Sequence, residues 1–428
     1  MSKLALFGGS PITSRKEYPI PQTDLGDLLS VVTCFGKGEF TGFRAGQYDG
    51  GEYVVEFEKL VASQHHSEHG IAFDTWSNGL VACLMSLGIE GGDEVIVTPY
   101  TMSSCATSIL TCGALPVFAD VCEDSGNMDP DSIEQKITSK TKAIFVVHLF
   151  GIPSNMQKIM EIAKKHNLYV FEDCAQSPLA LVEGKLCGTI GDVGGFSLTE
   201  SKHVMSGEGG IAITNNEKIN NGLRLIRNHG EVCCTDENVD TEKNPSYAAN
   251  VLGRSGLIGF NFRMTEMTAA LATSQWKKLE RVIEIKREMG RYLCKELGKI
   301  DFIKVMVPNY SHTPSWYTFP LRFLPQVAGV SREKFLLALN AEGVNFWGGY
   351  VTPLYRQDIY TTKKHWVVEE YGEHISYDSR DYPTVERLWK EELILTLDIR
   401  PPYTMEDMEN IVKAFHKVAK NIDTLRKL

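Results

Sequence analysis

Short apolar runs alternate with helical patterns through the first two-thirds of the chain. Seven runs are candidate strands, at residues 71–73, 94–98, 116–120, 143–148, 169–172, 194–198 and 210–214. Most of these runs are continuously apolar, as is typical of strands buried on both faces of a parallel sheet. Between several of them apolar residues recur at helical spacing, as at Val54, Phe57, Leu60 and Val61. This alternation predicts a mostly parallel sheet with helices on both sides.

The pattern changes after the seventh run. Residues 265–300 form one long amphipathic pattern rich in Lys, Arg and Glu, which predicts a helix that links two domains. Beyond this helix, residues 316–323 and 345–350 are predicted strands of a smaller α+β domain. We therefore expect a large domain over residues 1–280, which includes an N-terminal arm, and a small C-terminal domain over residues 281–428.

Composition and charge exclude several classes of protein. The net charge of −10 argues against nucleic acid or an anionic membrane as the main partner. No run approaches the roughly 18 apolar residues of a membrane helix, and the first residues lack the apolar core of a signal peptide. The ten cysteines form no C-x-x-C pair, and adjacent Cys233 and Cys234 are poorly placed to bond each other. We therefore expect reduced thiols and a cytoplasmic protein.

A lysine and an aspartate indicate the chemistry. Lys202 lies in a loop rich in Ser and Gly, and Asp173 follows the apolar run at residues 169–172. Ligands of parallel sheets gather at the carboxyl ends of the strands, where Asp173 is expected to lie. Such a pair suits pyridoxal 5′-phosphate (PLP), because the lysine can hold this cofactor as a Schiff base and the acid can keep its pyridine nitrogen protonated. Taken alone, each residue has an ordinary alternative, a solvated surface lysine and a helix-capping aspartate.

Further segments follow in a consistent order along the chain. They are Leu-Ala-Leu-Phe-Gly-Gly-Ser-Pro-Ile at 4–12, Leu-Gly-Ile-Glu-Gly-Gly-Asp at 87–93, Val-His-Leu-Phe-Gly at 147–151, Gly-Thr-Ile-Gly-Asp at 188–192, Arg-Asn-His-Gly at 227–230, Gly-Phe-Asn-Phe-Arg-Met-Thr-Glu at 259–266 and Glu-Asp-Met-Glu-Asn-Ile-Val at 406–412. Through these segments nearly the whole chain resembles the DegT/DnrJ/StrS family of sugar aminotransferases, which are fold-type-I PLP enzymes. The resemblance implies an α/β fold, with a seven-stranded mostly parallel sheet in the large domain. It also implies transfer of an amino group from glutamate or glutamine to a keto group on a sugar, nucleotide-linked in most relatives, or on a cyclitol.

The resemblance also implies which residues surround the cofactor. With Lys202 and Asp173 as the catalytic pair, these residues are Thr75, Trp76, Ser77, Met102, Asp173, Gln176, Ser197, Lys202, Asn261 and Arg263. The phosphate would lie at the turn of residues 75–77, where a helix begins after a strand, together with Ser197. Gln176 would lie near the phenolic oxygen. Asn261 and Arg263 would reach the cofactor of a neighbouring subunit, which implies a homodimer with shared active sites.

Two of these residues depart from the family pattern. Trp76 stands in the middle of a phosphate turn where family members have small residues. A shifted register through residues 77–79 would restore a small residue but shorten the following helix, so we prefer the unshifted one. Met102 stands where the family stacks an aromatic side chain on the pyridine ring. Its polarisable sulfur can still pack against a ring.

Candidate substrate-binding residues lie in segments without a helical or strand pattern, where binding residues concentrate. They are Pro11, Ile12, His203, Tyr355 and Arg356. Arg356, in the loop of residues 350–356, is the expected local cation for an anionic substrate, since the protein as a whole is acidic. An ordinary surface arginine is the alternative. His203 directly follows Lys202, and we expect a local structural role for it rather than that of a second base.

Other functions fit the sequence less well. A PLP-dependent dehydratase of the same fold would have a histidine in place of the lysine, and a non-catalytic relative would not need the Lys202–Asp173 pair. No G-x-G-x-x-G motif supports a nicotinamide dehydrogenase. His65, Glu68 and His69 fit the H-x-x-E-H zinc pattern, but no third ligand is evident. We expect them at a solvated helix end, without a metal.

Overall fold

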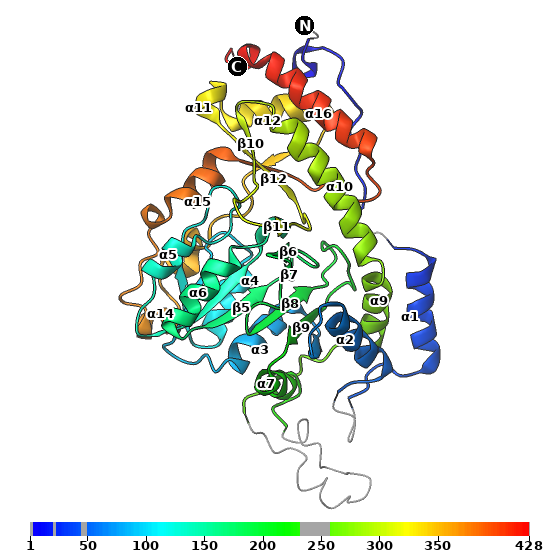
Figure 1. Cartoon of the computed structure of the whole chain (residues 1–428), viewed down its shortest axis with the longest axis vertical. Helices are drawn as coiled ribbons and strands as arrows, with labels where there is room; N and C mark the ends of the chain where they lie inside the picture. Colours follow the sequence, from blue (N-terminus) through cyan, green and yellow to red (C-terminus); the bar gives the residue numbers. More distant parts are fainter. Residues whose placement is uncertain (1–2, 20–22, 44–48, 232–256, 428) are drawn as a thin grey trace, which may run out of the picture.

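The computed structural model describes residues 3–19, 23–43, 49–231 and 257–427 of the 428-residue chain (Figure 1). Cys233 and Cys234 lie outside these residues, and the eight cysteines within them are free thiols. Among the described helices, none combines the length and the apolar character needed to span a bilayer.

The large sheet is made of the seven predicted strands. In spatial order they are β1 (His69–Phe73), β9 (Gly210–Thr214), β8 (Val193–Ser197), β5 (Tyr169–Asp173), β4 (Thr141–Val147), β2 (Glu94–Val97) and β3 (Leu115–Phe118). Strands from β8 to β3 pair in parallel, whereas β9 runs antiparallel to both β8 and β1. The strands are almost entirely buried, which confirms the interpretation of their apolar runs as a sheet covered on both faces.

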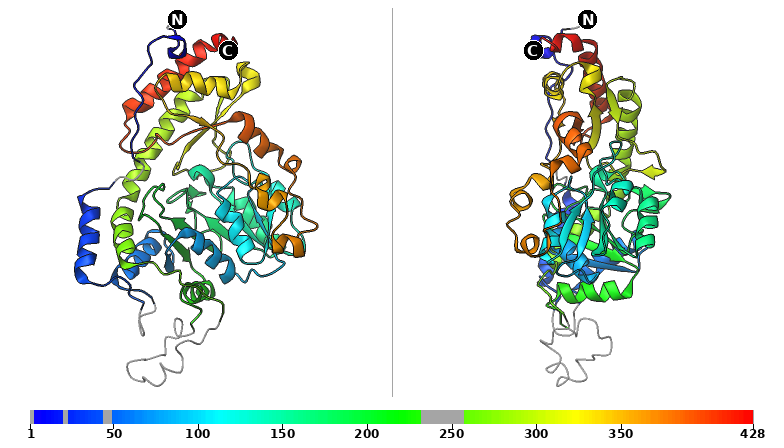
Figure 2. Two further views of the ribbon diagram at one scale, coloured as in Figure 1. Left: turned by 180° about the vertical axis from the view of Figure 1, so that it is seen from behind. Right: turned by 90° about the vertical axis from the view of Figure 1, so that its left-hand side faces the viewer.

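Helices lie on both sides of this sheet (Figure 2). Those of the large domain are α1 (Leu25–Lys37), α2 (Glu52–Gln64), α3 (Trp76–Ser86), α4 (Ser103–Thr111), α5 (Pro130–Gln135), α6 (Met156–His166), α7 (Glu217–Arg227) and α9 (Glu266–Trp276). In α2 the apolar face predicted from the sequence is buried, with Val54, Phe57 and Val61 in the core. Side-chain caps define where several helices begin. Thr75, for example, accepts the N–H of Asn78 at the start of α3.

The long helix predicted over residues 265–300 is wrong in one respect, because the structure divides it into α9 and α10 (Leu279–Leu297). α9 is enclosed between α1 and α2, and its last residue, Trp276, is buried and donates its indole N–H to Gln64 at 2.6 Å. α10 then leaves the large domain toward the small one (Figure 1). The chain bends at this point because the two halves pack against different partners.

The small domain is built on a four-stranded antiparallel sheet. Its strands, in spatial order, are β10 (Ile303–Val305), β12 (Phe319–Phe323), β14 (Leu393–Thr396) and β13 (Trp347–Gly348). The helices of this domain are α11 (Pro325–Ala328), α12 (Arg332–Ala341), α16 (Met405–Lys420) and α17 (Ile422–Leu425). The two strands predicted here are confirmed in shorter form as β12 and β13. A third, small sheet joins β6 (Leu181–Val182), β7 (Lys185–Leu186) and β11 (His312–Thr313).

Two segments pack across the expected boundary at residue 280. The N-terminal arm lies on the small domain, where Lys16 pairs with Asp407 at 2.6 Å (Figure 1). In the other direction, the segment with α13 (Asp358–Thr361), α14 (Trp366–Tyr371) and α15 (Pro383–Arg387) covers the β3 edge of the large sheet. There the Tyr377 hydroxyl donates to the Pro116 carbonyl at 3.1 Å. The two domains are thus tied together by their ends as well as by α10.

Candidate active site

A cavity of about 300 Å³ opens at the carboxyl ends of β4, β5 and β8. Most residues predicted around the cofactor line this single cavity, and they are Thr75, Trp76, Ser77, Met102, Asp173, Gln176, Ser197 and Lys202. The parallel strands explain the convergence, because the ends of neighbouring strands lie at one edge of the sheet.

Asp173, the last residue of β5, is held in one orientation. Its Oδ1 accepts the indole N–H of Trp76 at 2.9 Å and the backbone N–H of Ala175 at 3.0 Å. Its Oδ2 accepts the Cys105 thiol at 3.4 Å. Burial, and next the Asp173 charge, raise the pKa of Cys105 well above its ordinary value, so this thiol stays protonated. Oδ2 keeps acceptor capacity for a further donor inside the cavity, as a protonated ring nitrogen requires.

The Trp76 side chain does not fill the phosphate turn. It is buried and points beneath the cavity toward Asp173, in a slot formed by glycines. A methyl group built on Gly195 would lie 2.0 Å from Cη2 of Trp76, and one on Gly79 would lie 2.6 Å from its Cε3. The unshifted register through residues 75–77 is therefore compatible with a large residue at this position, because the glycines leave room for it.

The N-terminus of α3 provides a place for an anion. Its first N–H groups have no acceptor within the helix, and the positive end of the helix dipole faces the cavity wall formed by Thr75 and Ser77. Ser197, at the end of β8, lines the same cavity. Hydroxyls and N–H groups gathered at a helix start suit a phosphate monoester.

Lys202 lies in the turns that follow β8, where its backbone N–H bonds the Thr199 carbonyl at 3.0 Å. Its Nζ stands 4.7 Å from the ring centre of Tyr317. The Tyr317 hydroxyl in turn donates to Ser201 at 3.3 Å. A residue of the small domain therefore positions the lysine of the large domain.

Gln176 is not the solvated helix-start residue that was its alternative interpretation. It is buried, its Oε1 accepts the Phe150 N–H at 2.7 Å, and its Nε2 donates to the Tyr350 hydroxyl at 2.9 Å. Burial raises the pKa of Tyr350, so this hydroxyl remains protonated. The pair presents two fixed polar groups to the cavity that an oxygen on the cofactor ring could contact.

Asn261 and Arg263 do not line this cavity. Arg263 bonds the Asn228 side chain and lies 5.5 Å from the ring centre of Phe43. Asn261 is exposed and pairs through its backbone with Asn228. Within one subunit these two residues contact the large domain rather than the predicted site.

Four of the predicted substrate-binding residues do not line the cofactor cavity of this subunit. Arg356 forms a two-pronged ion pair with Glu386, at 2.7 and 2.6 Å, and Tyr355 is buried with its hydroxyl on the same carboxylate. Pro11 and Ile12 lie on the small domain, where the Ile12 N–H bonds the Glu342 carbonyl at 3.1 Å. The Glu386 carboxylate, which binds both Tyr355 and Arg356, belongs to a later segment of the chain. The pattern of the loop at residues 350–356 therefore did not indicate it.

His203 contacts the backbone of the small domain. Its Nε2 lies 3.2 Å from the carbonyl of Ser315, the group to which it can donate. Burial, and next the charge of Lys286, lower the pKa of His203 well below its ordinary value. A neutral, anchored imidazole is unsuited to act as a second base that changes protonation near neutral pH.

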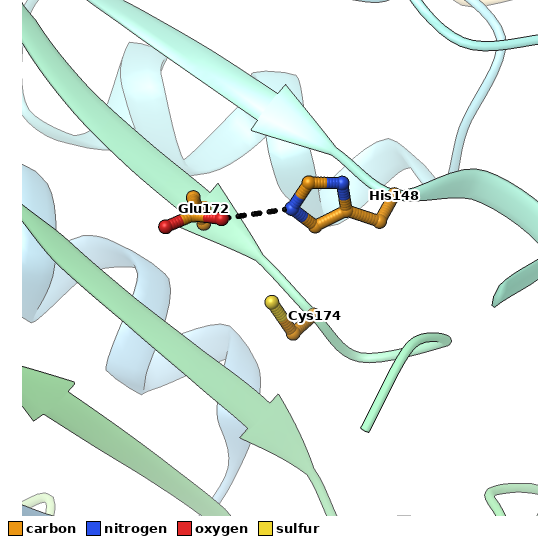
Figure 3. A group of neighbouring side chains, drawn as sticks. All are labelled: His148, Glu172 and Cys174. Carbon is orange, nitrogen blue, oxygen red and sulfur yellow. Dashed lines mark hydrogen bonds and ion pairs between the residues drawn. The ribbon is translucent and has the colours of Figure 1, made fainter. Parts of the chain in front are cut away.

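Behind Asp173 lies a buried cluster of His148, Glu172 and Cys174 (Figure 3). His148 Nδ1 accepts the Ser154 N–H at 2.9 Å, so its Nε2 carries a proton and donates to Glu172 at 3.0 Å. Three backbone N–H groups, of residues 188, 190 and 191, occupy the Glu172 carboxylate. The His148 and Glu172 ligand atoms are thus engaged, Cys174 interacts with His148, and the cluster braces β5 against β4 rather than offering an open metal site.

The H-x-x-E-H segment does not form one helix end. α2 ends at Gln64, and His69 already belongs to β1. His65 is not solvated as expected, because it is buried against Phe196 and bonds the Val61 carbonyl at 2.9 Å. Burial lowers the pKa of His65 to about 4.

Other residues of the cavity were not singled out from the sequence. They are Thr101, Ser104, Cys105, Val147, Ala175, Thr199, Ser201, Glu208, Tyr317 and Tyr350. The sequence could have indicated Cys105, because it lies one helical turn after Met102, which was predicted to contact the cofactor. Tyr350 begins the loop expected at the cavity mouth, whereas Tyr317 comes from the small domain without any local motif.

Comparisons with known proteins relate most of the chain to one family. The sequence profile of the DegT/DnrJ/EryC1/StrS aminotransferase family matches residues 41–416. A protein of Streptoalloteichus tenebrarius, provisionally named L-glutamine:3-amino-2,3-dideoxy-scyllo-inosose aminotransferase, is 31% identical over 99% of this chain and 100% of its own length. The GDP-perosamine synthase of Escherichia coli O157:H7 is 32% identical over 75% of this chain and 83% of its own.

The fold is shared with a solved aminotransferase structure. The enzyme from Psychrobacter cryohalolentis superposes with a TM-score of 0.82 at 27% sequence identity, and the match covers 95% of this chain and 100% of that one. The expected fold, with a seven-stranded sheet and a smaller C-terminal domain, is confirmed.

Proposed function

Because the chain belongs to the DegT/DnrJ/EryC1/StrS aminotransferase family, we propose that it uses PLP to move an amino group from glutamate or glutamine to a keto group on a sugar or cyclitol ring. The observation that supports this most is the convergence of Lys202, Asp173 and the α3 N-terminus on one cavity. An amine, an acid for the ring nitrogen and an anion site are the three groups that PLP needs from its protein.

When bound, PLP supplies a carbonyl that links to amines and a protonated ring that withdraws electrons from the attached carbon. Trp76 and Cys105 hold the Asp173 carboxylate in place, and this carboxylate would keep the ring nitrogen of a bound cofactor protonated. Thr75, Ser77 and Ser197 would hold the phosphate. Lys202 would hold the cofactor through its amine and would carry the proton taken from the donor α-carbon.

The names of the relatives support the two substrate classes. One relative is named for glutamine as donor and an inosose, a cyclitol ketone, as acceptor. Another is named for a GDP-linked sugar. We propose that this chain acts on an acceptor of the same two classes, in the cytoplasm.

This function predicts two separable half-reactions. Purified protein loaded with PLP is expected to lose the long-wavelength absorbance of its bound cofactor when L-glutamate or L-glutamine is added, because the amino group passes to the cofactor. Addition of a keto-sugar or keto-cyclitol is expected to restore the absorbance. D-Glutamate serves as the control, and the absence of any change with both L-donors would exclude the proposed donors.

We also propose a homodimer in which Asn261 and Arg263 reach the partner's cofactor phosphate. Neither residue lines the cavity of its own subunit. The outer face of α1 exposes a row of apolar side chains at helical spacing, and these are Leu25, Leu28, Leu29, Val32 and Phe35. Contiguous exposed apolar surface of this kind is typical of a subunit interface.

A subunit-mixing experiment tests the shared site. We expect Arg263→Ala to weaken PLP binding about tenfold or more, because a charge-assisted bond to phosphate is lost. At a PLP concentration too low to load Arg263→Ala, activity should return when Arg263→Ala subunits are unfolded and refolded together with Lys202→Ala subunits. One site of the mixed dimer then contains its own Lys202 and the intact arginine supplied by its neighbour. If the mixture stays as inactive as its components, or the wild-type enzyme is an active monomer, the arginine does not act across the interface.

A further inference from the structure

A second cavity, of about 560 Å³, lies on the other side of Lys202. It shares Ser201, Lys202 and Tyr317 with the cofactor cavity, so these residues form the common wall. The remaining wall comes from the start of α1, from the first turns of α10 and from the segment after β14. A molecule in this cavity would therefore lie next to the amine that the proposed reaction uses.

The wall of this second cavity is cationic, although the protein is acidic. Its lysines and arginines are Lys202, Lys277, Lys278, Arg281, Lys286 and Arg400, and the neutral His203 also lines it. Asp24 is the only carboxylate among its lining residues, and Lys278 already pairs with it at 2.7 Å. Lys277 is engaged by Glu56 at 2.9 Å outside the cavity. The other cations of the wall are Arg281, Lys286 and Arg400, and Arg400 lies near the Asp398 carboxylate.

Lys286 is the unusual member of this group. It is 3% exposed, on the inner face of α10, yet its ammonium has no hydrogen bond and no ion pair with any described residue. The titratable groups that face it are Arg400 and His203, and neither supplies negative charge. Burial, and next the Arg400 charge, lower the pKa of Lys286 to about 7. A buried cation without a counter-charge is costly, and such residues are usually paired.

Arg400 is positioned rather than mobile. Its guanidinium donates to the backbone carbonyls of Tyr18 and Pro19, at 3.1 and 3.0 Å, so the N-terminal arm fixes it at the cavity wall. Arg400 is half-buried and lies near the Asp398 carboxylate, whereas Lys286 is buried and has no counter-charge among the described residues. An anion that enters the cavity would supply the counter-charge that Lys286 lacks.

We propose that this cavity binds an oxyanion group of a substrate, with Lys286 as its direct contact and Arg400 and Arg281 beside it. The proposal deepens the function proposed above and rests on it for the identity of the substrate. Two sources share the chemistry, the carboxylate of the amino donor and the phosphate of a nucleotide-linked acceptor. Either would be held beside Lys202, where the amino group is transferred.

Inorganic phosphate and acetate, titrated calorimetrically into the PLP-loaded enzyme, are the first probes. We expect Lys286→Met to weaken binding of at least one of them about tenfold or more, because one charge-assisted hydrogen bond is lost. Lys304→Met, which changes an exposed lysine of β10, is the matched control and should bind as wild type. Because the change removes an unpaired buried charge, Lys286→Met should fold and melt at the same or a higher temperature. Lys286→Gln is the second variant should methionine not be tolerated.

Proton uptake adds a readout that a merely structural lysine would not change. At pH 8 the wild-type Lys286 is largely neutral, and an anion that raises its pKa must bind together with a proton. Titrations in buffers of different ionisation enthalpy should therefore show proton uptake in the wild type and in Lys304→Met, and none in Lys286→Met.

Two kinetic measurements then distinguish the donor carboxylate from the acceptor phosphate as the group that binds. A raised KM for glutamate or glutamine, measured in the donor half-reaction of Lys286→Met, assigns the site to the donor carboxylate. Weaker inhibition by GDP or UDP with an unchanged donor KM assigns it to the acceptor phosphate. Unchanged affinity for every probe, in a folded variant, overturns the proposal. Because the titrations require no turnover, a failure of the aminotransferase assignment would be seen separately, in the donor half-reaction of the wild type.

Discussion

Lys202→Ala is expected to reduce amino transfer by about four orders of magnitude or more. Proton transfer by a positioned side chain alone contributes about 10²–10⁴-fold, and this lysine also holds the cofactor. Its Nζ stands at the wall between the two cavities, 4.7 Å from the ring centre of Tyr317. Among the residues that line the cofactor cavity, Lys202 is the only amine, so no neighbour there can take over its role.

Single-turnover kinetics and borohydride reduction measure this effect. Reduction followed by peptide mass spectrometry should find the cofactor on Lys202 in the wild type and on no lysine in Lys202→Ala. Lys202→Arg keeps the positive charge but not the nucleophilic amine, and should be as inactive as the alanine variant. Lys158→Ala, which changes an exposed residue of α6, is the control and should retain both the adduct and the activity. An adduct on another lysine, or an active Lys202→Arg enzyme, would contradict the assigned role.

Asp173→Asn is expected to reduce turnover by about three orders of magnitude while PLP still binds. Removing one preorganised electrostatic group from an active site typically costs about 10²–10³ in kcat, and here the lost charge is the one that keeps the ring nitrogen protonated. The amide oxygen can still accept the Trp76 indole N–H, so the side chain should stay in place. We therefore expect the Asp173→Asn enzyme to contain PLP but to turn over slowly.

Cofactor stoichiometry and the rate of the donor half-reaction separate these two effects. Asp173→Glu restores the charge but displaces it, because the longer side chain no longer fits the Trp76 and Cys105 contacts, and should recover part of the rate. A half-reaction in Asp173→Asn within tenfold of the wild type would remove Asp173 from the mechanism. Loss of PLP from that variant would instead assign it to cofactor binding.

Local patterns predicted the large domain well. Each of the seven apolar runs is a strand, because strands buried on both faces need continuous apolar sequence whatever their neighbours are. Asp173 and Ser197 were located for the same reason, since parallel strands bring their carboxyl ends to one edge. The break between α9 and α10 was missed because helical spacing continues through it and only the packing partners change.

The substrate side could not be predicted in this way, because its residues come from distant segments. Arg356 was expected as a local cation for an anionic substrate, with an ordinary surface arginine as the alternative, and its ion pair with Glu386, thirty residues later, could not be predicted from the loop. Lys286 was not singled out from the sequence, although its position in α10 could have indicated a buried lysine. It occupies a place on the face of α10 where Ile283 and Leu293 are buried, and a lysine at such a place calls for an explanation.

The slot around Trp76 has a consequence for how this site can change. At Gly79 an added methyl group would clash with the indole, 2.6 Å from Cε3 of Trp76, whereas with a small residue at position 76 its nearest remaining neighbour would be Cδ2 of Phe73 at 3.3 Å. Replacing Trp76 first would cost about 3–5 kcal/mol for the void and would also remove a donor from Asp173. The effect of a methyl group at position 79 thus depends on the residue at position 76, so a sequence that places a larger residue at position 79 would also have to replace the tryptophan.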